Sequence, residues 1–197
     1  MAAIVEHEVR RRMILDKSLE LFIEEGYEDV TFQKIADRCG ITRTTLYIYF
    51  QNKREIFMYS IKQLGETLEN ALSSIVADEN LSAKERLKSV MMGVYKCSLE
   101  HRNLFSVLLM YLLQIQKTGV NTEEKVRRRT IKLHHLLSSI LIEGIDSGEF
   151  RKIDVRATNE VFYALIESLI YRLAILDQKD MPNFERMVDL TIEGICS

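Results

Sequence analysis

Residues 31–50 carry the residue types that could bind nucleic acid, with an arginine and several threonines grouped at the start of a short helical segment. An arginine can form paired hydrogen bonds with a guanine edge, and a threonine can bond a base edge or contact a thymine methyl. On a helix that begins at Thr42, five polar side chains are predicted to point outward. These candidates for reading DNA bases are Thr42, Arg43, Thr44, Thr45 and Tyr47.

A second group of residues could contact the DNA phosphates around that helix. Tyr49 and Lys53 flank it, although Tyr47 and Tyr49 could instead be core aromatics. Thr31 precedes another short helix, whose unpaired backbone N–H groups would attract a phosphate. A basic run near the N-terminus could also reach the DNA or could simply be a solvated helix start; it consists of Arg10, Arg11 and Arg12.

Two short helices joined by a tight turn would position these side chains. Thr31 suits the N-cap of the first helix, and the small Ala36 lets a second helix cross close by. Gly40 follows where the turn needs a positive φ. Three apolar side chains could pin the crossing: Ile35, Ile41 and Leu46. This is the helix-turn-helix pattern, in which the second helix enters a major groove.

The alternative is a helical ligand- or protein-binding module in which this corner binds no DNA. Residues 1–62 hold 10 basic and 10 acidic residues, so the segment is not basic overall. The pattern of residues still favours DNA binding, because five acids cluster away from the expected reading face. They are Glu20, Glu24, Glu25, Glu28 and Asp29.

The whole chain is predicted to be all-α. It has 197 residues with a single proline, and its apolar residues recur at intervals of three and four between short polar breaks. We expect nine helices and no strand, with a small N-terminal domain at residues 1–52 and a larger helical domain at residues 53–197. The expected helices cover about residues 8–24, 32–39, 42–50, 52–76, 82–99, 103–116, 121–148, 154–177 and 183–195.

Charge and cysteine usage limit the possible function classes. The formal net charge of −2 excludes a globally basic protein, so nucleic acid must be bound by a local surface. The three cysteines lie far apart, and no metal-binding, catalytic or nucleotide-binding motif is present. We therefore expect no metal, no cofactor and no enzymatic activity. No apolar stretch suits a signal peptide or a membrane span, which predicts a cytoplasmic protein.

Apolar, glycine and aromatic positions between residues 10 and 57 extend the helix-turn-helix pattern: Ile14-Leu15, Leu21-Phe22, Gly26-Tyr27, Thr31, Ile35-Ala36, Gly40-Ile41, Thr45-Leu46-Tyr47, Tyr49-Phe50 and Asn52-Lys53. Together they resemble the DNA-binding domain of the TetR family of transcriptional regulators. The resemblance implies a homodimer on a palindromic double-stranded operator, and most often a repressor that a small-molecule effector releases. Three positions depart from the usual family residues: Thr44, Ile48 and Gln51.

The resemblance also implies that residues 53–197 bind an effector and dimerise. Aromatic and apolar side chains could line an effector pocket, although each could equally be a core residue. The candidates are Met91, Tyr95, Phe105, Leu109, Tyr111, His134, Tyr163 and Tyr171.

The helix at residues 154–177 is apolar nearly all round, which is more hydrophobic surface than one core absorbs. With the helix at residues 183–195, it could form a four-helix bundle with its symmetry mate. The expected interface residues are Phe162, Leu165, Leu169, Leu173, Met187 and Thr191.

Overall fold

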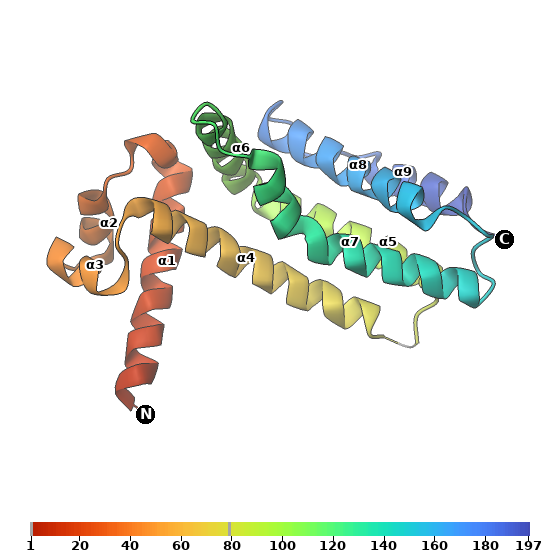
Figure 1. Ribbon diagram of the computed structural model, residues 1–197, viewed down its shortest axis with the longest axis horizontal. Helices are drawn as coiled ribbons and strands as arrows, with labels where there is room; N and C mark the ends of the chain where they lie inside the picture. The colour runs from red at the N-terminus through yellow and green to blue at the C-terminus, as the bar shows by residue number, and fades with distance from the viewer. Residues whose placement is uncertain (1, 79) are drawn as a thin grey trace. The chain divides into compact units, whose positions relative to one another are not determined.

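The computed structural model describes residues 2–78 and 80–197, and within them the chain is helical as predicted (Figure 1). Nine labelled α-helices follow one another, and the described residues form no strand beyond an isolated bridge between Phe150 and Cys196. The chain divides into two compact units, Met1–Glu66 and Thr67–Ser197. The first unit therefore extends past the predicted domain end at residue 52.

The first unit contains three helices and the beginning of a fourth. Their bounds are α1 at Ala2–Asp29, α2 at Phe32–Cys39, α3 at Arg43–Tyr49 and α4 at Lys53–Val76. The structure extends α1 beyond the predicted residues 8–24 in both directions. Gly26 interrupts it with φ 83° and ψ 163°, the break expected at that glycine.

Apolar side chains from all four helices form one small core in this unit. The start of α4 belongs to it, because Ile56 and Phe57 are fully buried and Ser60 Oγ donates a hydrogen bond to Leu15 O over 3.1 Å. This packing explains why the unit continues beyond residue 52. The other fully buried members include Ile14, Phe22, Val30, Ile35, Ala36 and Leu46.

The second unit is a bundle formed by the end of α4 and five further helices. Their bounds are α5 at Ala83–Glu100, α6 at Arg102–Gln116, α7 at Thr122–Asp146, α8 at Val155–Ala174 and α9 at Phe184–Glu193. Helix α5 packs against α7, α8 and α9, and α7 and α8 lie side by side (Figure 1). Their shared core includes Leu87, Leu137, Phe162, Leu169 and Phe184, all fully buried.

Local hydrogen bonds end and join these helices as the sequence indicates. Ser82 and Glu85 form a reciprocal capping box at the start of α5. The carboxylate of Glu149 accepts from the backbone N–H groups of Ala83 and Lys84, at 3.1 and 3.2 Å. This contact ties the turn after α7 to the start of α5.

A close approach at Gly144 generates a stability prediction. A Cβ at this position would lie 2.1 Å from the ring of Phe150, which is buried. Gly144→Ala should therefore lower the free energy of unfolding by about 1–3 kcal/mol, measured by chemical denaturation of the full chain. Gly65→Ala is the matched control, because this helical glycine has open space and the change should stabilise by roughly 0.5–1 kcal/mol. Equal stabilisation by both changes would contradict the packing at Gly144.

Candidate nucleic-acid interface and ligand pocket

Helix α3 presents one polar face to solvent and packs the other into the first unit. Leu46 is fully buried, whereas Arg43, Thr44, Tyr47 and Ile48 are exposed. The exposed fractions of Tyr47 and Ile48 are 51% and 68%. Tyr47 lies beside Arg43 and Thr44, and Ile48 beside Thr44, because residues three or four apart are neighbours on a helix surface. Helix α3 therefore offers a mixed polar and apolar strip of the kind that fits a major groove.

The turn before α3 fixes this orientation. Gly40 has φ 68° and ψ 33°, and its N–H and that of Ile41 close the end of α2 on Asp37 O and Ala36 O, both at 3.0 Å. Thr42 Oγ1 accepts from Thr45 N at 3.1 Å and caps α3. The sequence predicted both the left-handed glycine and the threonine cap.

Thr45 was predicted to read bases and Ile48 was not, and the exposure of both side chains differs from that expectation. Thr45 is half-buried, and its hydroxyl lies 2.8 Å from the Thr42 hydroxyl within the cap, so Thr45 is not part of the exposed strip. Ile48 is the most exposed apolar side chain of this strip, and it was not among the residues predicted to read bases. The helical interval of four from Thr44 was the signal that could have found it.

Two side chains of the strip hold each other in place. A guanidinium nitrogen of Arg43 donates to Tyr47 Oη at 3.2 Å, and the Arg43 guanidinium lies 5.7 Å from the Tyr47 ring centre. The Tyr47 ring also packs against Phe32, with centroids 4.6 Å apart. Arg43 is thus partly positioned before any ligand arrives.

The predicted phosphate-contacting residues fall into two groups. Thr31 is exposed and caps α2, accepting from Lys34 N at 3.2 Å, and Arg10 and Arg12 are exposed on α1. Arg11 instead lies over two aromatic rings, 4.9 Å from the centre of Phe50 and 4.2 Å from that of Tyr59. Tyr49 is half-buried and stacks on His7 at 4.6 Å. Arg11 therefore packs on two aromatic rings, whereas Arg10 and Arg12 face solvent.

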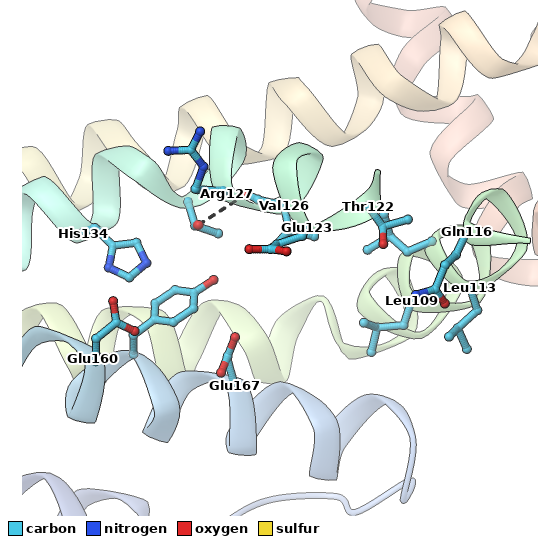
Figure 2. Close-up of a pocket in the computed structure, with 13 residues that line it drawn as sticks. Leu109, Leu113, Gln116, Thr122, Glu123, Val126, Arg127, His134, Glu160 and Glu167 are labelled. Carbon is cyan, nitrogen blue, oxygen red and sulfur yellow. Dashed lines mark hydrogen bonds between the residues drawn. The ribbon is translucent and has the colours of Figure 1, made fainter. Parts of the chain in front are cut away.

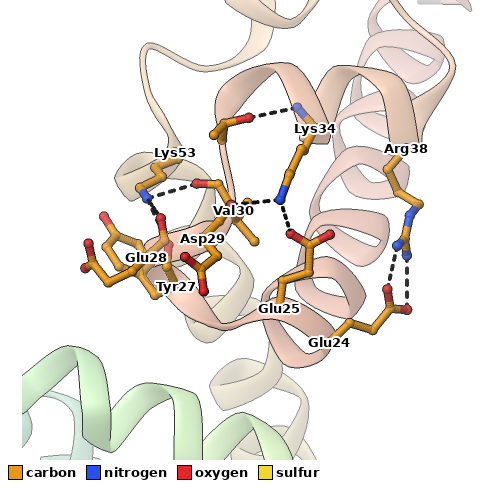
Figure 3. Close-up of polar contacts among 10 residues, drawn as sticks. Glu24, Glu25, Tyr27, Glu28, Asp29, Val30, Lys34, Arg38 and Lys53 are labelled. Atoms are coloured by element: carbon orange, nitrogen blue, oxygen red, sulfur yellow. Dashed lines mark hydrogen bonds and ion pairs between the residues drawn. The ribbon is translucent and has the colours of Figure 1, made fainter.

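Lys53, another predicted phosphate contact, has hydrogen-bond partners within its own unit. Its ammonium group donates to the carbonyl oxygens of Tyr27, Glu28 and Val30, each at 2.9 Å (Figure 3). It also lies 4.7 Å from the ring centre of Tyr27. A lysine has three N–H donors, and all three are used here. Lys53 joins the start of α4 to the carbonyl-rich end of α1.

Two of the clustered acids are paired with basic residues of α2. Arg38 donates through both terminal nitrogens to the carboxylate of Glu24, and Lys34 forms an ion pair with Glu25 at 2.5 Å (Figure 3). The hydrogen bond from Arg38 lowers the pKa of Glu24 below its usual range, with the charge of Arg38 adding to the effect. These pairs neutralise part of the acidic surface of the unit.

The second unit contains a pocket between α6, α7 and α8, with a volume of about 480 Å³ (Figure 2). Three of the predicted effector residues line it, namely Leu109, His134 and Tyr163. Apolar side chains of α6 and α7 form one wall of the pocket. They are Leu109, Leu112, Leu113 and Val126.

The other five predicted effector residues do not line this pocket. Met91 and Tyr111 are buried in the bundle, and Tyr95 stacks on Phe184 with ring centres 5.2 Å apart. Phe105 is half-buried outside the lining, and Tyr171 is exposed on α8. Residue type alone cannot separate a pocket aromatic from a core aromatic on an amphipathic helix.

Polar side chains of α7 and α8 form the opposite part of the pocket. His134 packs on Tyr163 with ring centres 4.2 Å apart, and its Nδ1 lies 3.0 Å from Asn159 Oδ1. Burial raises the pKa of the Tyr163 phenol, and the charges of Glu167 and Glu160 raise it further against a hydrogen bond with Thr130. The phenol thus remains protonated at neutral pH.

Comparison with known proteins identifies the family. The profile described as "Bacterial regulatory proteins, tetR family" matches residues 14–59, the helix-turn-helix and its supports. The fatty acid metabolism regulator protein of Bacillus subtilis strain 168 is 28% identical over 186 residues, covering 92% of this chain and 93% of that protein. Residues 14–59 form a TetR-type DNA-binding domain.

Solved structures share the fold of this chain over nearly its full length. A TetR transcription regulator from Haloarcula marismortui superposes with a TM-score of 0.84 at 19% identity, covering 96% of this chain and 100% of that one. The Bacillus subtilis regulator FadR in complex with stearoyl-CoA gives a TM-score of 0.74 at 24% identity, covering 94% and 97%.

The residues expected at a dimer interface differ in their burial. Phe162, Leu169 and Leu173 are buried in the core of their own subunit and cannot contact a partner. Leu165, Met187 and Thr191 are half-buried. The expectation failed because a helix apolar nearly all round does not reveal which side its own bundle covers. The exposed apolar side chains of α8 and α9 are Val161, Tyr171 and Leu190, with exposed fractions of 49%, 53% and 52%.

The three cysteines of the chain are free thiols. Cys39, Cys97 and Cys196 are unpaired by disulfide, and no cluster of His, Cys, Asp or Glu among the described residues could hold a metal ion. None of the described helices combines the length and apolar character needed to cross a bilayer.

The contacts of Lys53 predict a stability effect. Lys53→Met should lower the free energy of unfolding by about 1–2 kcal/mol, because three carbonyl groups lose a charged donor from a partly buried position. Arg54→Met is the control, since this neighbouring side chain is exposed and its loss should change stability by less than about 0.5 kcal/mol. Unchanged unfolding of Lys53→Met together with weaker binding to every DNA sequence would instead assign Lys53 to a phosphate.

Proposed function

We propose that this protein is a dimeric repressor that inserts its two α3 helices into successive major grooves of a palindromic operator. The observation that supports this most directly is the exposed strip of Arg43, Thr44, Tyr47 and Ile48 beside the fully buried Leu46. A single recognition helix reads only a half-site, so useful affinity needs two of them about 34–36 Å apart or a multiple of that distance.

In this proposal each exposed side chain of α3 has a distinct partner on the DNA. Arg43 hydrogen-bonds a guanine edge, while Thr44 and Ile48 contact thymine methyl groups or neighbouring base edges. Tyr47 orients Arg43 and reaches the groove wall. Phosphates are held by the start of α2 at Thr31, by Tyr49, and by the basic side chains of α1, Arg10 and Arg12.

We further propose that α8 and α9 form the dimer interface through their exposed sides. Val161, Ala164 and Tyr171 recur at helical intervals on α8, and Leu190 lies exposed on α9. Exposed apolar side chains grouped in this way favour a covered surface, and a two-fold axis would bring the same patch of each subunit together.

The effector would bind in the pocket between α6, α7 and α8 and lower the affinity for DNA. Helix α4 contributes residues 53–66 to the first unit and its last residues to the second, so it is our candidate for transmitting the change. The effector can weaken DNA binding only by preferring a dimer whose half-site spacing does not match the operator. In this role the protein binds DNA and an effector and catalyses no reaction. It would act in the cytoplasm, together with the DNA.

Selection of bound sequences from a random DNA pool tests the proposal as a whole. The expected result is one enriched sequence with two inverted half-sites centred about one helical turn apart, or a multiple of that distance. Enrichment of no duplex, even at low salt, would contradict the proposal. The upstream region of the protein's own gene supplies a second duplex for gel-shift measurements.

Two substitutions on α3 should alter base preference differently. Arg43→Ala should weaken binding by roughly 1–3 kcal/mol and relax the preference at one guanine position, because a paired hydrogen bond is lost. Ile48→Ala should cost about 1 kcal/mol and relax one thymine position, since the lost apolar contact is small. A panel of single-base operator variants measures both effects. Uniform weakening across all the duplexes would contradict the assigned roles.

The interface residues generate a prediction about the oligomeric state. Leu190→Arg should shift the protein from dimer to monomer in size-exclusion chromatography with light scattering, because two arginines would meet across the two-fold axis. Ile142→Arg is the control, since Ile142 is an equally exposed apolar residue on α7. A dimer that persists in Leu190→Arg and dissociates in Ile142→Arg would move the interface to α7.

A further inference from the structure

The polar groups of the ligand pocket are unevenly divided between hydrogen-bond donors and acceptors. The division begins at the buried Asn159 of α8, whose amide nitrogen donates to His134 O at 2.7 Å and to Ser138 Oγ at 2.6 Å. A carbonyl oxygen can only accept a hydrogen bond, so the nitrogen of the Asn159 amide must face His134 O. The amide oxygen therefore faces the His134 ring.

This contact sets the tautomer of His134. Its Nδ1 lies 3.0 Å from Asn159 Oδ1, which can only accept, so Nδ1 must carry the proton. In the neutral ring Nε2 then carries a lone pair. Nε2 makes no hydrogen bond to any residue that the structure describes, and His134 lines the pocket. The pocket thus contains an imidazole that accepts a hydrogen bond from whatever binds beside it.

Three carboxylates complete the acceptor side of the pocket. Glu160 and Glu167 lie two helical turns apart on the same face of α8, on either side of Tyr163, and Glu123 faces them from α7 (Figure 2). Among the side chains that the structure describes, none forms an ion pair or a hydrogen bond with the carboxylate of Glu123, Glu160 or Glu167. The lining thus holds three carboxylates and one guanidinium, that of Arg127, so acidic groups are in excess among its residues.

The donors of the lining are fewer and are differently placed. The Tyr163 hydroxyl is a donor of the lining beside His134, and the guanidinium of Arg127 points away from the carboxylates of Glu123 and Glu167 (Figure 2). Thr122 and Gln116 lie toward the other end of the pocket, beside Leu109 and Leu113 (Figure 2). The part of the pocket around His134 is thus dominated by acceptors.

We propose that the effector of this regulator is an amphipathic organic cation that carries an N–H donor. Its ammonium group would donate to His134 Nε2 and lie among the carboxylates of Glu160 and Glu167, while its hydrocarbon part would lie along the apolar wall of α6 and α7. This inference rests on the proposed function, because it names the ligand class of the same pocket.

The charges of the pocket disfavour an anionic effector. A carboxylate or a phosphate placed beside His134 would meet the lone pair of Nε2 and the three glutamates. Juxtaposed like charges cost free energy and thereby discriminate against a ligand of the wrong sign. The FadR structure with stearoyl-CoA shows that a thioester of an anionic carrier fits that protein; the pocket described here points to a ligand of opposite charge.

A series of ligands with one shared tail tests the proposal by isothermal titration calorimetry on the full-length protein. The probes are decylamine, decyltrimethylammonium and decanoate, with stearoyl-CoA as a fourth. Decylamine should bind tightest, at least about tenfold tighter than decanoate, because only it combines the positive charge with N–H donors. Tighter binding of decanoate or stearoyl-CoA would overturn the proposal, as would binding of none of the four.

Carboxylate variants connect that binding to the pocket. The double variant Glu160→Gln with Glu167→Gln should weaken decylamine binding about tenfold, since each partly exposed charge pair contributes a modest share. Glu100→Gln is the control, because this exposed carboxylate lies outside the pocket. Unchanged decylamine affinity in the double variant would overturn the proposal.

Two further measurements separate this inference from the proposed function. Gel shifts on the selected operator report DNA binding without any ligand. If no shift is seen, the proposed function is contradicted. If the shift is seen but the titrations fail, only the proposed ligand class is contradicted. Nitrogen NMR of the full chain should show His134 protonated at Nδ1, with its signals assigned by their loss in His134→Gln. A proton on Nε2 of the neutral ring would overturn the acceptor role of His134.

Discussion

The burial of Leu46 is the constraint on which DNA recognition by this protein depends. Helix α3 has seven residues, too few to be stable alone, so packing into the first unit must both form it and orient it. Because Leu46 is fully buried and Gly40 closes the preceding turn in the left-handed region, Arg43, Thr44 and Ile48 are left facing solvent. The same core that stabilises the unit therefore determines which side chains can reach a base.

In the second unit, too, the burial of apolar helix faces determines which side chains remain accessible. Its helices bury one apolar face each, yet α6, α7 and α8 leave a pocket whose apolar wall faces a group of hydrogen-bond acceptors. The buried amide of Asn159 is satisfied by three hydrogen bonds and in doing so fixes the proton position on His134. The hydrogen bonds of Asn159 inside the bundle thus determine which nitrogen of His134 can accept a hydrogen bond in the pocket.

Much of this architecture could be predicted from the sequence, because the signals are local. Gly40 and the apolar spacing around Leu46 indicated the helix-turn-helix, and the caps marked most helix boundaries. The role of Lys53 depends on carbonyl groups more than 20 residues away, and the burial of Phe162 depends on which side of α8 its own bundle covers. The tautomer of His134 required the geometry of Asn159. Long-range packing, which no local spacing encodes, decides these three features.

Hydroxyl-radical footprinting of the full-length protein on the upstream region of its own gene tests the central claim most directly. If α3 reads DNA as described, two short protected segments should appear on one face of the duplex, related by inverted sequence and separated by about one helical turn or a multiple of it. A single protected segment would contradict the account, and so would uniform protection that follows no sequence.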